Sequence, residues 1–222
     1  GFPIQDAVCI ESDEGLIDLV RGPIQRETGV DPFDDDRVSL RRVSPELALM
    51  SDNSEPFDII LSSPSASSMT EGAASFTEEY YRRAGRHLAD GGIFCQRFEC
   101  IDYGIEPIRM VLKSARNAFH RVIAVESGAG EFLLLASNSE NGFDAEKMLV
   151  RLELPHVRRV LARSGLDWSV PLSFPAYDHN ALEEICDESR FAANSATHGQ
   201  LAASAPMKLT TSAEICTATA ST

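Results

Sequence analysis

The chain has 222 residues, of which 43% are hydrophobic and 24% charged, and its 34 acidic and 20 basic side chains give a formal net charge of −14. This length allows one sizeable core with a small appendage, and the composition is ordinary for a soluble globular protein. The negative charge would repel a phosphate backbone, so we expect no nucleic-acid partner. A cationic ligand suits this charge, although an acidic composition commonly serves only solubility.

Membrane and disulfide signals are both missing from the sequence. No apolar run approaches the roughly 20 residues that span a bilayer, and no basic region precedes an apolar core at the N-terminus. We expect no membrane contact by this segment, although a longer chain could carry membrane segments outside it. The five cysteines are an odd number and form no close CxxC pair. A reducing, cytoplasmic location is the simplest expectation.

The sequence of the first 61 residues predicts three strands and one helix. Residues 7–10 form a short apolar run typical of a strand, and residues 14–26 form an amphipathic helix that Gly22-Pro23 should kink or end. Alternating side chains over residues 38–43 indicate a second strand, and the apolar run 57–61 indicates a third.

A helix, a fourth strand and another helix follow. Ser75 with Glu78 three residues later matches a capping box, so we expect a helix to begin there. Asp90-Gly91-Gly92 should end this helix, and residues 93–98 predict the fourth strand. Apolar residues at helical spacing over residues 105–115 predict the next helix.

Residues 120–137 have the pattern of a β-hairpin. Residues 120–126 and 131–137 are apolar runs joined by a short glycine-containing connector, which is typical of two antiparallel strands. The whole order predicts an α/β fold with a doubly wound, mostly parallel sheet of the methyltransferase-like type over residues 1–140. We expect residues 141–206 to form a helical extension and residues 207–222, rich in Ala, Ser and Thr, to form a loose tail.

Three ordered segments, 57–65, 75–81 and 90–96, carry a resemblance to a known family. Over roughly residues 5–137 the chain resembles the core of the spermidine synthases, which are polyamine aminopropyltransferases, and in particular a bacterial subgroup often fused to membrane segments. The resemblance implies decarboxylated S-adenosylmethionine as a co-substrate, with no tightly bound cofactor, and putrescine as the acceptor. A nucleoside or a polyamine is therefore the expected small-molecule partner, and a homodimer is one form of assembly to consider.

The resemblance also assigns residues on the donor side. Glu11 ends the first predicted strand, where this fold hydrogen-bonds ribose hydroxyls, but the residue could equally be an exposed acid that favours the dipole of the following helix. Ser44 stands where the family usually has an Asp that recognises the adenine amino group. Ser62 lies at the carboxyl edge of the sheet beyond the third strand, where ligands of such folds bind, and we call this edge the rim. The family carries a Gly-rich turn one strand before residue 7, so we expect this sequence to be a fragment without its first strand and Gly-rich loop.

The acceptor side departs from the family at its catalytic acid. Ser63 occupies the position of the Asp or Glu that takes a proton from the attacking amine, and a neutral serine is poorly suited to that role. Losing a general base typically costs about 10²- to 10⁴-fold in rate. Ser65 and Gln96 are candidate polyamine contacts, although a glutamine at a strand end can simply be a capped polar group. Substitute acids near the rim are Glu71, Glu99 and Asp102.

We therefore predict a spermidine synthase-like domain with reduced or absent activity, that is, a pseudoenzyme. The alternative is a non-catalytic module that binds a nucleoside, a polyamine or a protein subunit, and a third reading is an active transferase with a different acid. A serine hydrolase is disfavoured because Leu-Ser-Ser-Pro lacks the Gly-x-Ser-x-Gly elbow. The five histidines are scattered without the close spacing of a metal motif, so we expect no metal.

Overall fold

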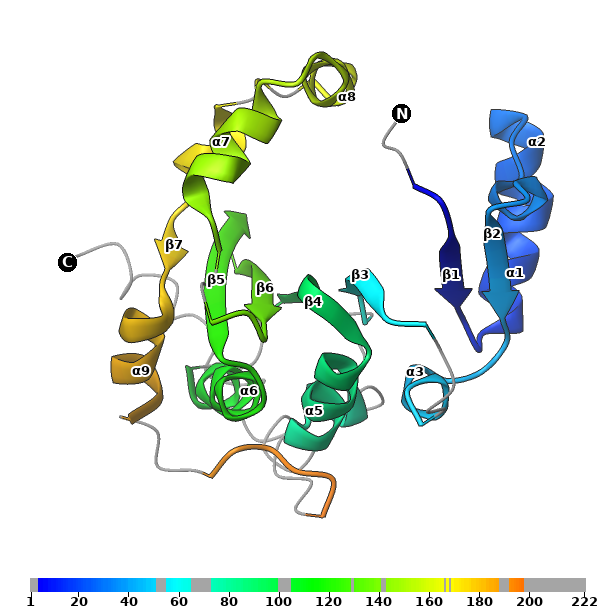
Figure 1. Cartoon of the computed structure of the whole chain (residues 1–222). Coiled ribbons are helices and arrows are strands. Elements are labelled where there is room, and N and C mark those ends of the chain that lie inside the picture. The colour runs from blue at the N-terminus through cyan, green and yellow to red at the C-terminus, as the bar shows by residue number, and fades with distance from the viewer. Residues whose placement is uncertain are drawn as a thin grey trace. The chain divides into compact units, whose positions relative to one another are not determined.

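The computed structural model describes residues 4–50, 55–64, 73–99, 105–128, 130–140, 143–165, 167, 169–187 and 192–197. The chain divides into two compact units, residues 1–53 and residues 54–222. Figure 1 labels the elements of both units along the chain. Within the described ranges, no helix combines the length and the apolar character that crossing a membrane requires.

The first unit contains a pair of parallel strands connected by a helical segment. Its elements are β1 (Ala7–Ile10), α1 (Glu14–Leu19), the π-helical turn η1 (Val20–Ile24), α2 (Gln25–Thr28), the 3-10 turn η2 (Pro32–Asp34), β2 (Val38–Arg41) and α3 (Pro45–Ala48). β1 and β2 pair in parallel, with Ala7 opposite Val38 and Ile10 opposite Arg41. A parallel pair needs a crossover connection, which the helical segment supplies.

The predicted irregularity at Gly22-Pro23 is confirmed, and its form is a wider helical turn. Pro23 lies inside the π-helical turn η1, so the chain stays helical through the proline and continues into α2. The helical segment ends at Gly29, whose φ of 72° is the left-handed conformation that glycine adopts without a Cβ clash. The predicted helix over residues 14–26 therefore forms, with a local change of winding.

The second unit contains a five-stranded sheet with helices. Its elements are β3 (Phe57–Ser62), the 3-10 turn η3 (Ala73–Phe76), α5 (Glu78–Arg86), β4 (Leu88–Glu99), α6 (Ile105–Ala118), β5 (Arg121–Gly128), β6 (Glu131–Ser137), α7 (Ala145–Leu152), α8 (Pro155–Arg163), the 3-10 turn η4 (Val170–Ser173), β7 (Ala176–Tyr177) and α9 (His179–Asp187). The strand order in the sheet is β3-β4-β6-β5-β7.

The pairing within this sheet sets the direction of every strand. β3 and β4 pair in parallel, with Ser62 opposite Gln96, whereas β4 with β6 and β6 with β5 pair antiparallel. β5 therefore runs in the same direction as β3 and β4, so the amino ends of these three strands share one edge of the sheet. The α/β class, the parallel crossover from β3 to β4 and the antiparallel hairpin are all confirmed.

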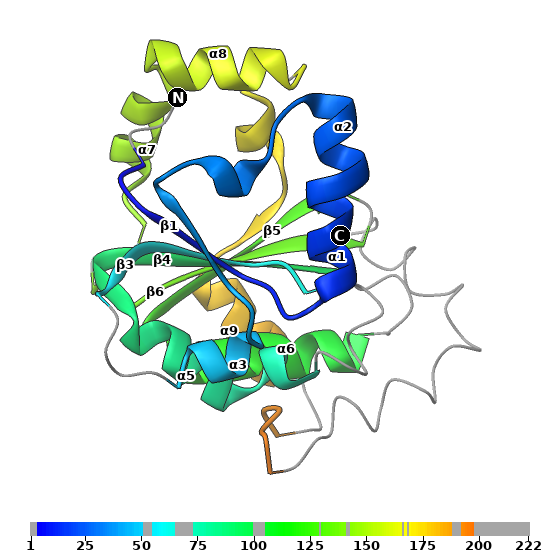
Figure 2. The same cartoon turned by 90° about the vertical axis from the view of Figure 1, so that its right-hand side faces the viewer.

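Helices cover one face of this sheet. Figure 2 shows α5, α6 and α9 on the same side of the strands, and α5 packs against β4 while α6 and α9 pack against β5. Alternate side chains of the strands face these helices and form the core, because successive residues of a strand point to opposite faces. The buried hydrophobic residues on this face include Phe94, Phe98, Val122, Ala124, Leu134 and Ala136.

The starts of α5 and β4 differ from the predicted ones. α5 is capped by Thr77, whose Oγ1 accepts a hydrogen bond from the Tyr80 backbone N at 3.2 Å, and Ser75 lies one turn earlier in η3. The capping box at Ser75 was therefore wrong, because the chain makes a 3-10 turn before the helix begins. β4 begins at Leu88, so Asp90-Gly91-Gly92 lies inside the strand and not at a helix end.

The described part of the chain after residue 140 contains helices and also a short strand that was not predicted. α7, α8 and α9 account for its helical content, whereas the two-residue β7 pairs antiparallel with β5, with Tyr177 opposite Ala124. A two-residue strand carries no recognisable period, and its formation depends on the open edge of β5. The boundary proposed near residue 140 stays a prediction.

Candidate functional site

The rim predicted from the sequence begins where β3 ends. Ser62 is the last residue of β3 and pairs across to Gln96 on β4. Ser62 is half-buried, and the Gln96 side chain is fully buried. Both residues lie on the sheet face that α5 covers, because Gln96 alternates in register with the core residues Phe94 and Phe98.

Gln96 is the centre of a buried hydrogen-bond network. Its Nε2 donates to Ser62 Oγ at 3.2 Å and to the Ser75 backbone carbonyl at 3.0 Å. Its Oε1 accepts a hydrogen bond from the Tyr81 hydroxyl at 2.5 Å. The Tyr80 hydroxyl also donates to Ser62 Oγ, at 3.3 Å. The network therefore joins β3, η3, α5 and β4 below the rim.

The Tyr81 hydroxyl supplies this network with a neutral donor. Tyr81 is completely buried, and burial followed by the neighbouring Tyr80 raises its pKa well above the usual range of a tyrosine. The hydroxyl therefore keeps its proton at any physiological pH and can donate it to Gln96. Tyr81 was not singled out from the sequence, although its place beside Tyr80 on the apolar side of the helix was a usable signal.

Ser63 lies beyond the network. Its side chain is exposed, and no described residue forms a hydrogen bond with it. The hydroxyl thus stands at the carboxyl end of β3 without a described group that could raise its basicity. Of the other acceptor-side predictions, Ser65, Glu71 and Asp102 lie outside the described residues, whereas Glu99 is described.

Glu99, the substitute acid that is described, belongs to an ion-pair network at the end of β4. Its Oε1 pairs with Arg97 Nη2, and the same guanidinium nitrogen lies 2.6 Å from Glu131 Oε2 on β6. Glu131 also accepts a hydrogen bond from Ser127 Oγ at 2.8 Å. Arg97 and then Ser127 lower the pKa of Glu131 from its ordinary value. Arg97 thus shares its charge between two carboxylates, and Glu99 has a cationic partner already.

Two of the donor-side candidates, Glu11 and Ser44, lie in the first unit, whereas Ser62 lies in the second. Glu11 Oε1 accepts a hydrogen bond from the Asp13 backbone N at 2.7 Å, directly before α1. Ser44 caps α3, because its Oγ accepts a hydrogen bond from the Leu47 backbone N at 3.3 Å. Both side chains therefore bind the local backbone, and their roles toward a nucleoside stay predictions.

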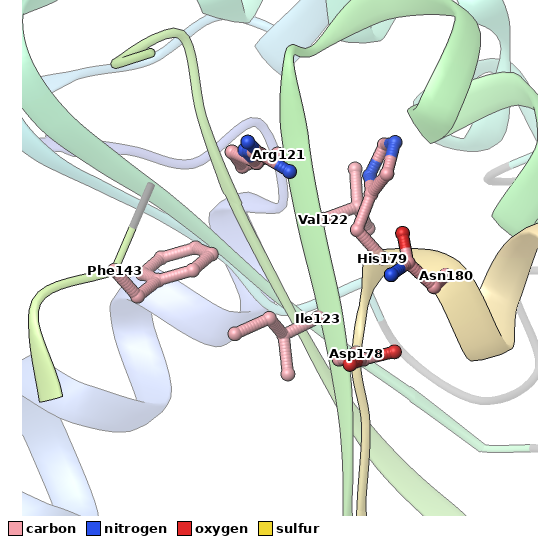
Figure 3. Close-up of a pocket in the computed structure, with 7 residues that line it drawn as sticks. All are labelled: Arg121, Val122, Ile123, Phe143, Asp178, His179 and Asn180. Carbon is pink, nitrogen blue, oxygen red and sulfur yellow. The ribbon is translucent and has the colours of Figure 1, made fainter. Parts of the chain in front are cut away.

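A pocket beside β5 lies away from the rim. It is lined by Arg121, Val122, Ile123, Phe143, Asp178, His179 and Asn180 (Figure 3). Arg121 is the first residue of β5, so this pocket is at the edge where the parallel-running strands begin, opposite the edge that holds Ser62. Ligands of open α/β sheets bind at the carboxyl edge, so we place the candidate site at the rim. The described side chains include no group of three or more metal-ligating residues.

A comparison with protein families identifies the family of this chain. Residues 2–127, more than half of the chain, match the spermine/spermidine synthase domain. The chain belongs to this family. The matched range contains β1 to β4 and both sets of candidate residues, so the family assignment rests on the region that carries the rim.

A solved structure has the same fold. A probable spermidine synthase from Corynebacterium glutamicum has 16% sequence identity and a TM-score of 0.53, over 85% of this chain and 62% of that one. The spermidine synthase from Thermotoga maritima has 20% identity and a TM-score of 0.48, over 64% of this chain and 50% of that one. This chain therefore spans only half to three-fifths of the length of these proteins. No curated protein matches the chain in sequence.

Proposed function

We propose that this domain is a spermidine synthase-type domain in which ordinary aminopropyl transfer is reduced or lost. The observation that carries the proposal is Ser63, an exposed neutral hydroxyl at the end of β3 where the family has a carboxylate. The proposed setting is the cytoplasm, which the unpaired described cysteines Cys9, Cys95 and Cys186 support.

The chemistry of aminopropyl transfer explains why the side chain at position 63 matters. In aminopropyl transfer the amine nitrogen of putrescine attacks the aminopropyl carbon, the carbon–sulfur bond of decarboxylated S-adenosylmethionine breaks, and methylthioadenosine leaves. The attacking amine must lose a proton, which a carboxylate can accept while it also holds the cationic acceptor. A serine hydroxyl carries no charge at neutral pH, so it attracts the cation weakly and is a poor proton acceptor.

A second candidate function is a non-catalytic module that binds a nucleoside, a polyamine or a protein subunit. The buried network of Gln96 supports it, because this network holds the end of β3 without the help of a catalytic acid. Calorimetry of the full-length protein with methylthioadenosine, and separately with putrescine, tests this reading. Heat of binding without turnover is the expected result, and no heat with either compound at millimolar concentration would contradict it.

The decisive experiment restores the acid at residue 63. Full-length protein, Ser63→Asp and Ser63→Asn are compared for spermidine formation from putrescine and decarboxylated S-adenosylmethionine. Asn matches Asp in size but brings no charge, so it controls for the added volume. We expect little or no product from the unmodified protein and from Ser63→Asn, and a rate for Ser63→Asp that is about 10²- to 10⁴-fold higher where the donor site is intact.

Two outcomes would overturn the proposed loss of activity. Turnover by the unmodified protein at about 1 per second or faster lies in the common enzyme range and would mean that another base operates. Glu99→Gln in the same assay would then show whether Glu99 has that role. Equal rates for Ser63→Asp and Ser63→Asn would show that the missing charge is not what limits the reaction.

A further inference from the structure

We propose that Gln96 is a positioning residue, held by Tyr81, which fixes the Ser62 hydroxyl for a ligand of the rim and contacts no ligand itself. The inference deepens the proposed function and rests on the rim being a ligand site. It differs from the sequence-based prediction for Gln96, which made this side chain a polyamine contact.

The amide of Gln96 has no free hydrogen to offer a ligand. An amide nitrogen carries two hydrogens. One is donated to Ser62 Oγ and the other to the Ser75 carbonyl, at 3.2 and 3.0 Å. Gln96 is also fully buried. A ligand at the rim would have to break a buried hydrogen bond to bind this amide, which typically costs about 1–3 kcal/mol when a buried group is left unsatisfied.

The hydrogen-bond partners of Gln96 allow one orientation of its amide. The Ser75 carbonyl can only accept, so the nitrogen of Gln96 must face it. The oxygen then faces Tyr81, whose hydroxyl donates to it. The Ser75 carbonyl and the Tyr81 hydroxyl therefore select together the orientation in which Gln96 Nε2 reaches the end of β3.

The same contacts orient the hydroxyl of Ser62. Its oxygen accepts hydrogen bonds from Gln96 and from Tyr80, which occupies both of its lone pairs. The hydroxyl hydrogen then points away from both donors, and it has no acceptor among the described residues. Ser62 is half-buried at the carboxyl edge of the sheet. The positioned group is thus a hydrogen-bond donor, which suits a neutral or anionic acceptor atom of a nucleoside better than a cationic amine.

Gln96→Glu gives a pH-dependent test of this positioning. A buried carboxyl keeps one of the amide's two donated hydrogen bonds, and only in its protonated form, because an ionised one would face the Ser75 carbonyl and Ser62 Oγ without a hydrogen to donate. Its pKa in the folded state is therefore expected above that in the unfolded state. The stabilising contacts are then present below the unfolded pKa and are lost as the pH rises through the folded pKa.

Amide hydrogen exchange of the full-length protein measures this without any ligand. Peptides over residues 57–64 and 73–81 are compared between Gln96→Glu and the unmodified protein at pH 5 and pH 8. We expect little difference at pH 5 and clearly faster exchange of Gln96→Glu at pH 8. Val122→Ala, a core change in β5 outside the network, is the control and should alter exchange by the same ratio at both pH values. A ratio for Gln96→Glu that does not change with pH would overturn the proposal.

Binding of methylthioadenosine supplies the second readout. Tyr81→Phe removes the donor that orients Gln96 but touches neither Ser62 nor the rim, and we expect it to weaken binding by up to about tenfold, the equivalent of one hydrogen bond. If the unmodified protein binds methylthioadenosine and Tyr81→Phe binds it with the same affinity, the positioning role of Gln96 is overturned. The proposed function is then unaffected. No binding to the unmodified protein would count against the nucleoside ligand, and the exchange experiment would still decide the role of Gln96.

Discussion

Tyr81 packs among aromatic rings that leave its hydroxyl directed at one polar partner. The ring makes edge contacts with Tyr80, Phe94 and Phe119, at centroid distances of 6.0, 5.8 and 6.3 Å. The hydroxyl at the end of this apolar ring reaches Gln96. A buried tyrosine usually needs such a partner, because an unsatisfied hydroxyl in an apolar core is costly. Packing and hydrogen bonding thus fix the same side chain.

Removing this hydroxyl should destabilise the protein. Tyr81→Phe keeps the ring but leaves Gln96 Oε1 buried without its donor, so we expect a loss of about 1–3 kcal/mol in the free energy of unfolding. Chemical denaturation measures the loss. Tyr177→Phe is the matched control, because Tyr177 is half-buried and no described residue hydrogen-bonds its hydroxyl, and it should change stability by less than about 0.5 kcal/mol. Equal effects of the two variants would contradict the role given to the buried hydroxyl.

The Asp35 carboxyl makes the stability of the protein depend on pH. Side-chain and backbone hydrogen bonds from Arg37 lower the pKa of Asp35 to about 2. Because the folded pKa is depressed, the stabilisation is present above the ordinary unfolded pKa and is lost as the pH falls through about 2. NMR titration of the Asp35 carboxyl should show this midpoint, and Arg37→Gln should move it up toward the ordinary value. An unchanged midpoint in Arg37→Gln would assign the shift to another cause.

Residues at both ends of helix α5 determine where the helix begins and ends. Thr77 caps it, Glu78 and Glu79 occupy its first turn, and Arg83 and Arg86 its last turn, which is the charge order that favours the helix dipole. Its buried side carries both tyrosines of the Gln96 network. The position of the first turn therefore decides where the network lies relative to β3 and β4.

The cap of α5 can be tested by a conservative pair of variants. Thr77→Ala removes the Oγ1 that accepts from the Tyr80 backbone N, and we expect a loss of about 1 kcal/mol in stability. Thr77→Ser keeps the hydroxyl and should retain most of the stability. Denaturant unfolding of both variants gives the comparison. A loss as large in Thr77→Ser as in Thr77→Ala would show that the methyl group, and not the cap, is what matters.

At the scale of the whole molecule, the family match crosses the division into two units. Residues 2–127 include all the described strands and helices of the first unit and the strands β3 and β4 of the second. The core of the second unit centres on Phe94, which stacks on Phe119 with ring centroids 5.5 Å apart. The same side of β4 carries Gln96, so the site and the core share one face of one strand.

A core substitution should therefore affect the second unit far more than an exposed one on a neighbouring strand. Phe94→Ala removes a fully buried ring, and we expect a loss of about 3–5 kcal/mol. Leu61→Ala on β3 changes a side chain that is 77% exposed and should cost less than about 0.5 kcal/mol. Thermal and chemical unfolding of both variants would test this. A large loss in Leu61→Ala would show that another surface covers β3.

The sequence by itself determined the α/β class, the existence of the strands β1 to β4, the hairpin and the family. Period-two and helical spacing are local signals, so residues 7–10 and 57–61 could be assigned without knowledge of their neighbours. The departure at Ser63 was also readable, because it is a matter of residue type. Only the tertiary structure decided that Thr77 caps α5 and that β7 joins β5, since both depend on where the chain turns. It also decided that Gln96 faces Tyr81, Ser62 and the Ser75 carbonyl, because hydrogen bonds between residues far apart in the chain leave no periodic trace in the sequence.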